Sequence, residues 1–82
     1  MSEEQILELI AALEQIEQDS SVPKNVRLKV KGAMETLMSQ EVNLKLKANR
    51  ALQELDDISN DLNVPSYVWP QIWNVVSLLE GL

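Results

Sequence analysis

The chain contains no cysteine and no histidine among its 82 residues. The lack of cysteine excludes disulfides, thiolate nucleophiles and cysteine-based zinc sites. The lack of histidine removes the most common general base near neutral pH. Only two glycines are present, at isolated positions, so there is no glycine-rich phosphate loop. These absences argue against an enzyme, and we expect no catalytic, cofactor-binding or metal-ligating residues and no cofactor.

Long apolar runs are also missing from the sequence. No run approaches the roughly 18 residues that a transmembrane helix needs. The first residues are acidic and do not resemble a secretory signal. We therefore expect a cytoplasmic protein that does not associate with membranes.

Positive charge is scarce and confined to the middle of the chain. The net charge is −6, made up of −6 over residues 1–22, +5 over residues 24–50 and −5 over residues 51–82. An acidic total argues against a dedicated nucleic-acid binder. The basic middle segment either pairs with acidic neighbours inside the domain or forms a local patch for phosphates.

One motif occurs twice, 42 residues apart. Residues 16–26 and 58–68 both read Ile-x-x-Asp-x-x-Val-Pro-x-x-Val. Because proline favours a helix start and pushes the preceding residue out of the helical region, each copy predicts a corner between two helices. The residues that define the two corners are Asp19, Val22, Pro23, Asp61, Val64 and Pro65. Asp19 either accepts backbone N–H groups within its turn or binds something outside the chain.

Apolar residues spaced by three and four predict helices on both sides of each corner. The first helix is expected over about residues 3–18, and Ser2 with Gln5 forms a capping box at its start. Pro70 lies in the first two turns of the last helix. Because proline has no N–H to bond the carbonyl of Ser66, we expect this helix start to kink or tighten.

The repeat therefore predicts two αα-hairpins, at about residues 3–39 and 41–80, within one helical domain of residues 1–82. At the offset of 42, almost all matching positions are corner residues or lie on the apolar helix face. Two hairpins can close on each other as a four-helix bundle or stack as a short solenoid. Because solenoids generally need about three repeats, we predict an all-α, four-helix up-and-down bundle.

Trp69 and Trp73 are the strongest candidates for a functional surface, since their spacing of four places them on one side of a helix. They either fill the thin core or form an exposed apolar patch for self-association. Val42 and Leu46 point away from the core face, where they meet either a partner or a helix end, and they complete this candidate interface.

A candidate basic patch consists of Lys24, Arg27 and Lys31, on a separate face of the second helix. These side chains either solvate the helix, pair with the first helix, or contact phosphates. Asp56, Asp57 and Asp61 could offer oxygen ligands, but they lack the spacing of a metal-binding loop, so we predict no metal site.

The sequence resembles two known protein families. Residues 26–37 and 44–55 are similar to the helix pattern of HEAT repeats, which implies a protein-binding scaffold. The acidic first helix, the Asp-x-x-Val-Pro corner, Leu44-Lys45-x-x-Ala48, and the segments at residues 57–65 and 72–80 together resemble a family of small archaeal proteins, catalogued as an uncharacterised protein family. That resemblance implies a four-helix up-and-down bundle, an archaeal cytoplasmic origin, no assigned activity and no functional residues.

Composition, repeat and candidate surfaces together favour a non-enzymatic helical module for protein–protein interaction. Its expected partner is a second copy of the chain, as a homodimer that uses the last helix, or another protein. The alternative is a nucleic-acid-associated accessory protein that uses the candidate basic patch.

Overall fold

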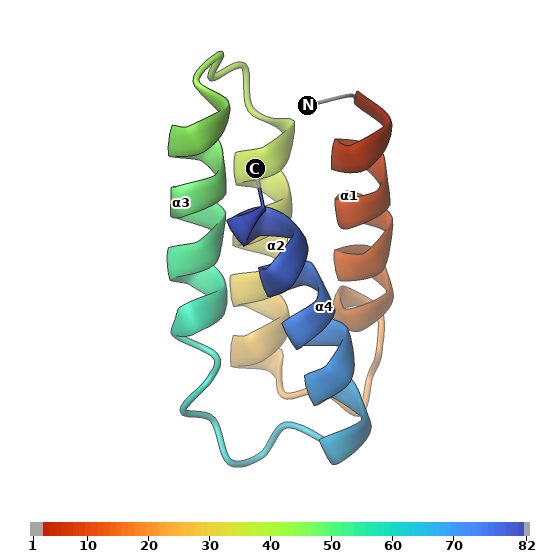
Figure 1. Ribbon diagram of the computed structural model, residues 1–82. Coiled ribbons are helices and arrows are strands. Elements are labelled where there is room, and N and C mark those ends of the chain that lie inside the picture. Colours follow the sequence, from red (N-terminus) through yellow and green to blue (C-terminus); the bar gives the residue numbers. More distant parts are fainter. Residues whose placement is uncertain (1–2, 82) are drawn as a thin grey trace.

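The computed structural model describes residues 3–81, which form four α-helices and contain no β-strand. The helices are α1 (Glu3–Glu17), α2 (Lys24–Met38), α3 (Leu44–Asp56) and α4 (Trp69–Glu80). A single 3₁₀ turn, η1 (Ser66–Val68), directly precedes α4. Consecutive helices run in opposite directions, as Figure 1 shows. The prediction of an all-α fold with four helices is confirmed.

The four helices pack in a closed ring. α1 packs against α2, α2 against α3, α3 against α4, and α4 returns to α1. The α1–α2 and α3–α4 connections lie at one end of the molecule, and the α2–α3 connection lies at the other (Figure 1). The contact between α1 and α4 is what a closed bundle requires, because it brings the first and last helices of the two hairpins together.

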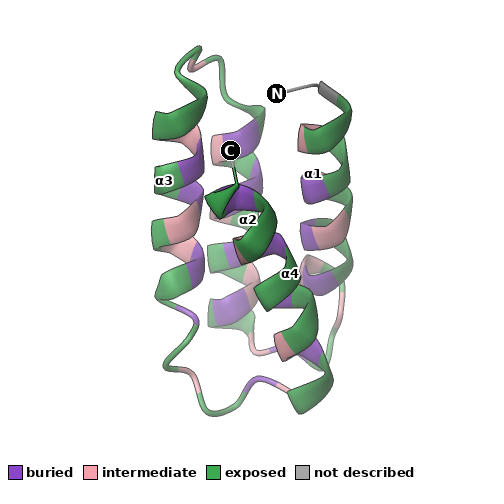
Figure 2. Cartoon of the chain, in the orientation of Figure 1, coloured by how far each residue is buried: buried purple, intermediate pink, exposed green. Residues whose placement is uncertain are grey.

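The core is built only from aliphatic side chains and one methionine, and the described residues include no buried polar or charged side chain. Buried positions face inward on all four helices (Figure 2). The core residues are Leu9, Leu13, Ile16, Val22, Val26, Val30, Ala33, Met34, Leu37, Ala48, Ala51, Leu55, Ile58, Val64, Val68, Ile72, Val75 and Leu79. Their removal from water supplies the main driving force for folding.

Positions that are 42 residues apart share their burial. The pairs in which both members are buried are Leu9 and Ala51, Leu13 and Leu55, Ile16 and Ile58, Val22 and Val64, Val26 and Val68, Val30 and Ile72, Ala33 and Val75, and Leu37 and Leu79. Each half of the chain therefore contributes the same pattern of side chains to one shared core.

The two predicted corners lie between helices and have similar geometry. The backbone angles are φ −55° and ψ 146° at Pro23, and φ −56° and ψ 140° at Pro65. Val22 and Val64, which precede the prolines, are both buried under their corners. The proline ring fixes its own φ and keeps the preceding valine out of the helical region. The preceding helix therefore cannot continue through the corner, and the next helix starts after the proline in a new direction.

The start of α4 differs from the start of α2, and Pro70 explains the difference. In α2 the first bond is α-helical, from Arg27 N to the carbonyl of Pro23 at 3.0 Å. At the equivalent place in the second half, Val68 N bonds the carbonyl of Pro65 at 2.9 Å, which is the tighter 3₁₀ pattern. The predicted tightening at Pro70 is confirmed.

The remaining helix boundaries are close to those predicted. α1 ends at Glu17, one residue before the expected end, and Ser2 of the predicted capping box lies outside the described residues. The α2–α3 connection spans residues 39–43, and Oδ1 of Asn43 caps α3 by accepting a hydrogen bond from Leu46 N at 3.1 Å. Of the helices in the described part of the chain, none combines the length and apolar character that crossing a bilayer requires.

Candidate functional site

The two tryptophans of α4 form a stacked pair. Their ring centroids are 5.9 Å apart and their planes differ by 24°. Trp69 is half-buried and packs against the core, whereas 53% of Trp73 is exposed. The two alternatives raised by the sequence therefore apply to different residues: Trp69 extends the core, and Trp73 presents an ordered aromatic surface to solvent.

Trp73 also lines an open pocket of about 500 Å³ between α3 and α4, which we call the α3–α4 groove. Its apolar surface comes from Leu52, Leu55, Trp73 and Val76. Its polar residues are Asn49, Gln53, Asp56, Ser59 and Glu80. A volume of this size is within the range of pockets that bind drug-sized ligands, roughly 300–1,000 Å³.

Both charged residues of the α3–α4 groove are acidic and end a helix. Asp56 is the last residue of α3, and Glu80 is the last residue of α4. Since the two helices are antiparallel, the carboxylates belong to opposite ends of the groove (Figure 1). The C-terminal end of a helix already carries partial negative charge from its free carbonyls. The groove therefore combines an apolar surface with negative potential at both ends.

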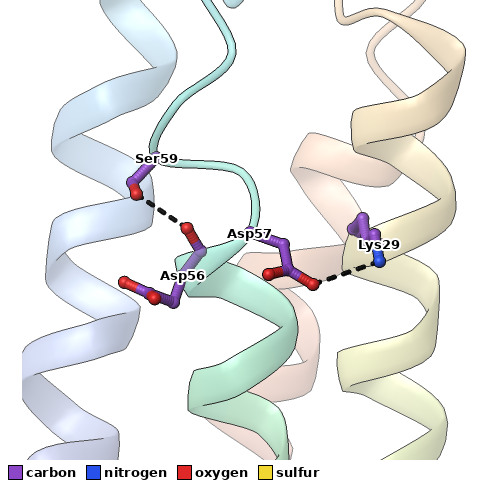
Figure 3. Close-up of polar contacts among 4 residues, drawn as sticks. All are labelled: Lys29, Asp56, Asp57 and Ser59. Carbon is purple, nitrogen blue, oxygen red and sulfur yellow. Dashed lines mark hydrogen bonds and ion pairs between the residues drawn. The ribbon is translucent and has the colours of Figure 1, made fainter.

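Two consecutive aspartates at the end of α3 point in different directions (Figure 3). The Asp57 carboxylate turns toward α2, where its Oδ2 lies 3.2 Å from Nζ of Lys29 in an ion pair. The Asp56 carboxylate turns toward α4. Ser59 Oγ donates a hydrogen bond of 2.7 Å to the backbone carbonyl of Asp56, which fixes the helix end. Asp56 is thus available to the groove, and Asp57 is not.

The other predicted interface residues lie elsewhere. Val42 is 91% exposed in the α2–α3 connection, and Leu46 is exposed in the first turn of α3. Neither lines the α3–α4 groove. The structure therefore separates Val42 and Leu46 from Trp73, with which the sequence grouped them.

The candidate basic patch contains one residue with a structural role. Arg27 is half-buried, and its Nε donates a hydrogen bond of 3.0 Å to the carbonyl of Val22 in the first corner. Lys24 and Lys31 are exposed on α2. Of the three predicted side chains, Arg27 stabilises the corner, which leaves two lysines for any contact with phosphates.

The corner aspartates make the same local bond in both halves. Oδ1 of Asp19 accepts from Ser21 N at 2.9 Å, and Oδ1 of Asp61 accepts from Asn63 N at 2.8 Å. These bonds support the local alternative for Asp19 and are typical of aspartate in turns.

The second oxygen of each aspartate joins the two corners. Tyr67 Oη donates to Oδ2 of Asp19 at 2.5 Å, and Asn25 Nδ2 donates to Oδ2 of Asp61 at 2.9 Å. The Tyr67 hydroxyl bond, followed by the backbone bond from Ser21, lowers the pKa of Asp19 below its ordinary value. The same bond from Tyr67 to the carboxylate raises the pKa of Tyr67.

Most residues of the contacts between the corners, and most residues of the α3–α4 groove, were not identified from the sequence. Tyr67 and Asn25 were missed, although both occupy the same repeat position, 42 residues apart. In the α3–α4 groove only Trp73 had been selected for a surface. The helical spacing of Trp73, Val76 and Glu80 was the available signal, because residues three and four apart share a helix face.

Comparison with known proteins places this bundle in a family. The whole chain, residues 1–82, matches the model of an uncharacterised protein family, UPF0147, and the chain belongs to that family. A UPF0147 protein of Methanosarcina mazei is 42% identical over 81 residues, which cover 99% of this chain and 87% of that protein. A UPF0147 protein of Metallosphaera sedula is 38% identical over 81 residues, covering 99% of this chain and 91% of that protein.

A solved structure confirms the fold. The crystal structure of a protein of unknown function, MMP1188, is similar to this chain with a TM-score of 0.95 at 35% sequence identity. The match covers 100% of this chain and 93% of that one. The resemblance to an uncharacterised archaeal family, noted from the sequence, is therefore confirmed together with the helical fold.

Proposed function

We propose that this protein is a non-enzymatic helical module that binds a segment of another protein in the α3–α4 groove. The observation that carries the proposal is the position of Trp73. A large aromatic side chain is about half exposed, and it lines the open groove. Tryptophan is among the residues that contribute most to binding at the centres of protein interfaces.

The stacking of Trp73 on Trp69 supports this role. Binding usually requires interface side chains to lose conformational freedom, which weakens the affinity. Because Trp73 rests on a ring that is itself packed against the core, part of this ordering is already present in the free protein. Trp73 is thus suited to contact a partner in the position that it already occupies.

Charge favours a different protein over a second copy of the chain as the partner. In a two-fold dimer formed through this groove, the same patch lies on both sides of the interface. The carboxylates of Asp56 and Glu80 from both protomers would then gather in one interface, between chains that each carry a net charge of −6. Like charges across an interface oppose association. The homodimer predicted from the sequence stays a prediction, tested by sedimentation equilibrium of the purified chain.

Site-specific photo-crosslinking followed by affinity measurement tests the proposal. A benzophenone amino acid at position 53, where the exposed Gln53 lines the groove, leaves Trp73 intact and identifies the partner in cells. The same amino acid at position 7 is the matched control, because Leu7 is exposed on α1. With the partner purified, we expect Trp73→Ala to raise Kd about 30-fold, which is typical of an interface hot spot. Leu7→Ala is expected to leave Kd unchanged.

An unchanged Kd for folded Trp73→Ala contradicts the proposal. A second variant, Asn49→Arg, places a bulky side chain in the α3–α4 groove from an exposed helical position and leaves both tryptophans intact. If the partner binds this variant as tightly as the wild type, the groove is not the binding site.

A further inference from the structure

We infer that the α3–α4 groove takes a basic segment, in which a lysine or arginine side chain of the partner lies against Trp73 between the carboxylates of Asp56 and Glu80. This inference rests on the proposed function and specifies the chemistry of the partner. It depends on three features of the groove, namely its unpaired carboxylates, its aromatic surface and its size.

The groove carboxylates differ from the other aspartates near the helix ends. Asp57 is paired with Lys29, Asp61 accepts from Asn25, and Asp19 accepts from Tyr67. Within residues 3–81, the side chains of Asp56 and Glu80 have neither a hydrogen bond nor an ion pair. Their negative charge is therefore free to bind a cation from outside the chain.

The helix ends increase the negative potential of the groove. Neither α3 nor α4 has a basic residue in its last turn, where lysine or arginine would oppose the helix dipole. Each helix instead ends in a carboxylate that lines the groove. A cationic side chain bound there would neutralise charge that α3 and α4 leave unbalanced.

Trp73 adds a second attraction for the same side chain. Tryptophan is the best aromatic acceptor for a cation–π interaction, which requires an ammonium or guanidinium group within about 6 Å of the ring. The methylene groups of lysine or arginine cover apolar surface while the charged head remains near polar groups. Leu52 and Val76 supply such surface beside Trp73.

The size of the groove indicates a peptide segment. A volume of about 500 Å³ matches pockets that hold whole drug-sized ligands, so it has room for a cationic side chain and its neighbours. The two carboxylates end different helices at opposite ends of the groove, with Trp73 and Val76 on α4 along its apolar surface. This arrangement suits an amphipathic segment in which basic and apolar side chains alternate, as in helix-in-groove recognition.

Three synthetic peptides test the inference. The first is a 12-residue amphipathic helix of leucine, alanine and arginine. The second has citrulline at each arginine position, which keeps the shape and removes the charge. The third has glutamate there. Binding is followed by tryptophan fluorescence and by amide chemical shifts. We expect the arginine peptide to bind at least about tenfold more tightly than the citrulline peptide, and its affinity to fall as salt is added. Its binding is expected to change the amide chemical shifts of residues that line the groove. The glutamate peptide is expected not to bind.

Matched variants separate this inference from the proposed function. The double variant Asp56→Asn, Glu80→Gln is expected to lower the affinity for the arginine peptide at least about tenfold. The control Asp57→Asn lies one residue away, but its side chain turns toward α2, so we expect it to leave this affinity unchanged. If Trp73→Ala abolishes binding but neutral carboxylates do not, the groove binds proteins and the basic specificity is wrong. If all variants bind the arginine peptide equally, the peptide binds outside the groove and the inference is wrong, whereas the proposed function is decided by the effect of Trp73→Ala on the Kd of the partner. If a dimer forms that Trp73→Ala dissociates, a second copy is the occupant and the inference is overturned.

Discussion

The hydroxyl of Tyr67 donates a hydrogen bond of 2.5 Å to Oδ2 of Asp19, across 48 positions of sequence. Its counterpart is the bond from Asn25 to Asp61. Tyr67 and Asn25 are 42 residues apart, as are the two aspartates, so each half of the chain supplies one donor and one acceptor. We call these two bonds the corner clasp. It joins the two hairpin corners at one end of the bundle by a reciprocal exchange.

Replacing Tyr67 by phenylalanine tests the clasp. Because the phenylalanine ring keeps the apolar part of the side chain, the change removes the hydroxyl bond with little loss of packing. We expect a lower free energy of unfolding and a rise in the pKa of Asp19 toward its ordinary value, since the Tyr67 hydroxyl is the largest cause of its lowering. Urea denaturation measures the first, and carboxyl carbon shifts measured against pH give the second. An Asp19 pKa that does not move would show that the bonds from Ser21 and the charge of Arg27 set it without Tyr67.

The pH dependence of the clasp follows from the two pKa shifts. Asp19 has its pKa lowered from 3.8, so its contribution to stability is present above 3.8 and is lost as pH falls through the lower folded value. Tyr67 has its pKa raised from 10.0, so its contribution is present below 10.0 and is lost as pH rises through the higher folded value.

The difference in unfolding free energy between the wild type and Tyr67→Phe should therefore be constant between these limits and shrink beyond either one. Denaturation midpoints across the pH range measure this difference. A difference that is largest at pH 11 would contradict the assignment of the hydroxyl as donor to an ionised Asp19.

Matched core truncations test whether the two halves contribute equally to stability. Ile16 and Ile58 occupy the same repeat position, and both are fully buried. Ile→Val at a buried site typically costs about 0.5–1.5 kcal/mol, from lost apolar burial and the small cavity that remains. We expect both variants to fall in this range and to differ little, with Leu62→Ala as an exposed control that changes stability by less than about 0.5 kcal/mol. A large difference between the two isoleucine variants would show that the halves pack unequally.

Helices and corners could be predicted from the sequence because their causes are local. Apolar spacing placed Ile16, Val30 and Leu79 in the core, and the Val-Pro pairs marked where the chain turns. The tightened start of α4 followed from the missing N–H of Pro70 alone.

The candidate site could not be predicted as fully, because it depends on which helices become neighbours. Asp56 and Glu80 line the same groove only because α3 packs against α4, and their separation in sequence gives no sign of this packing. The split between Trp69 and Trp73 depends on how far α4 is rotated toward the core. Tyr67 was missed because its partner belongs to the other half of the repeat.

Gly32 offers a test of how closely α2 and α3 approach. A Cβ at this position would lie 3.2 Å from Oε2 and 3.4 Å from Cδ of Glu54 on α3. These atoms are the flexible end of a partly exposed side chain, so they can move by a few tenths of an ångström. Alanine is favoured over glycine within a helix by about 1 kcal/mol. We therefore expect Gly32→Ala to raise the free energy of unfolding by up to about 1 kcal/mol, measured by urea denaturation.

The double variant Gly32→Ala, Glu54→Ala separates helix propensity from the contact with Glu54. If the Glu54 side chain must shift to admit the new methyl group, the gain from Gly32→Ala becomes larger once Glu54 is truncated. If Gly32→Ala instead lowers stability, and does so equally with and without the Glu54 side chain, then backbone packing at the α2–α3 crossing limits this position. A loss that disappears in the double variant would assign the cost to the carboxylate itself.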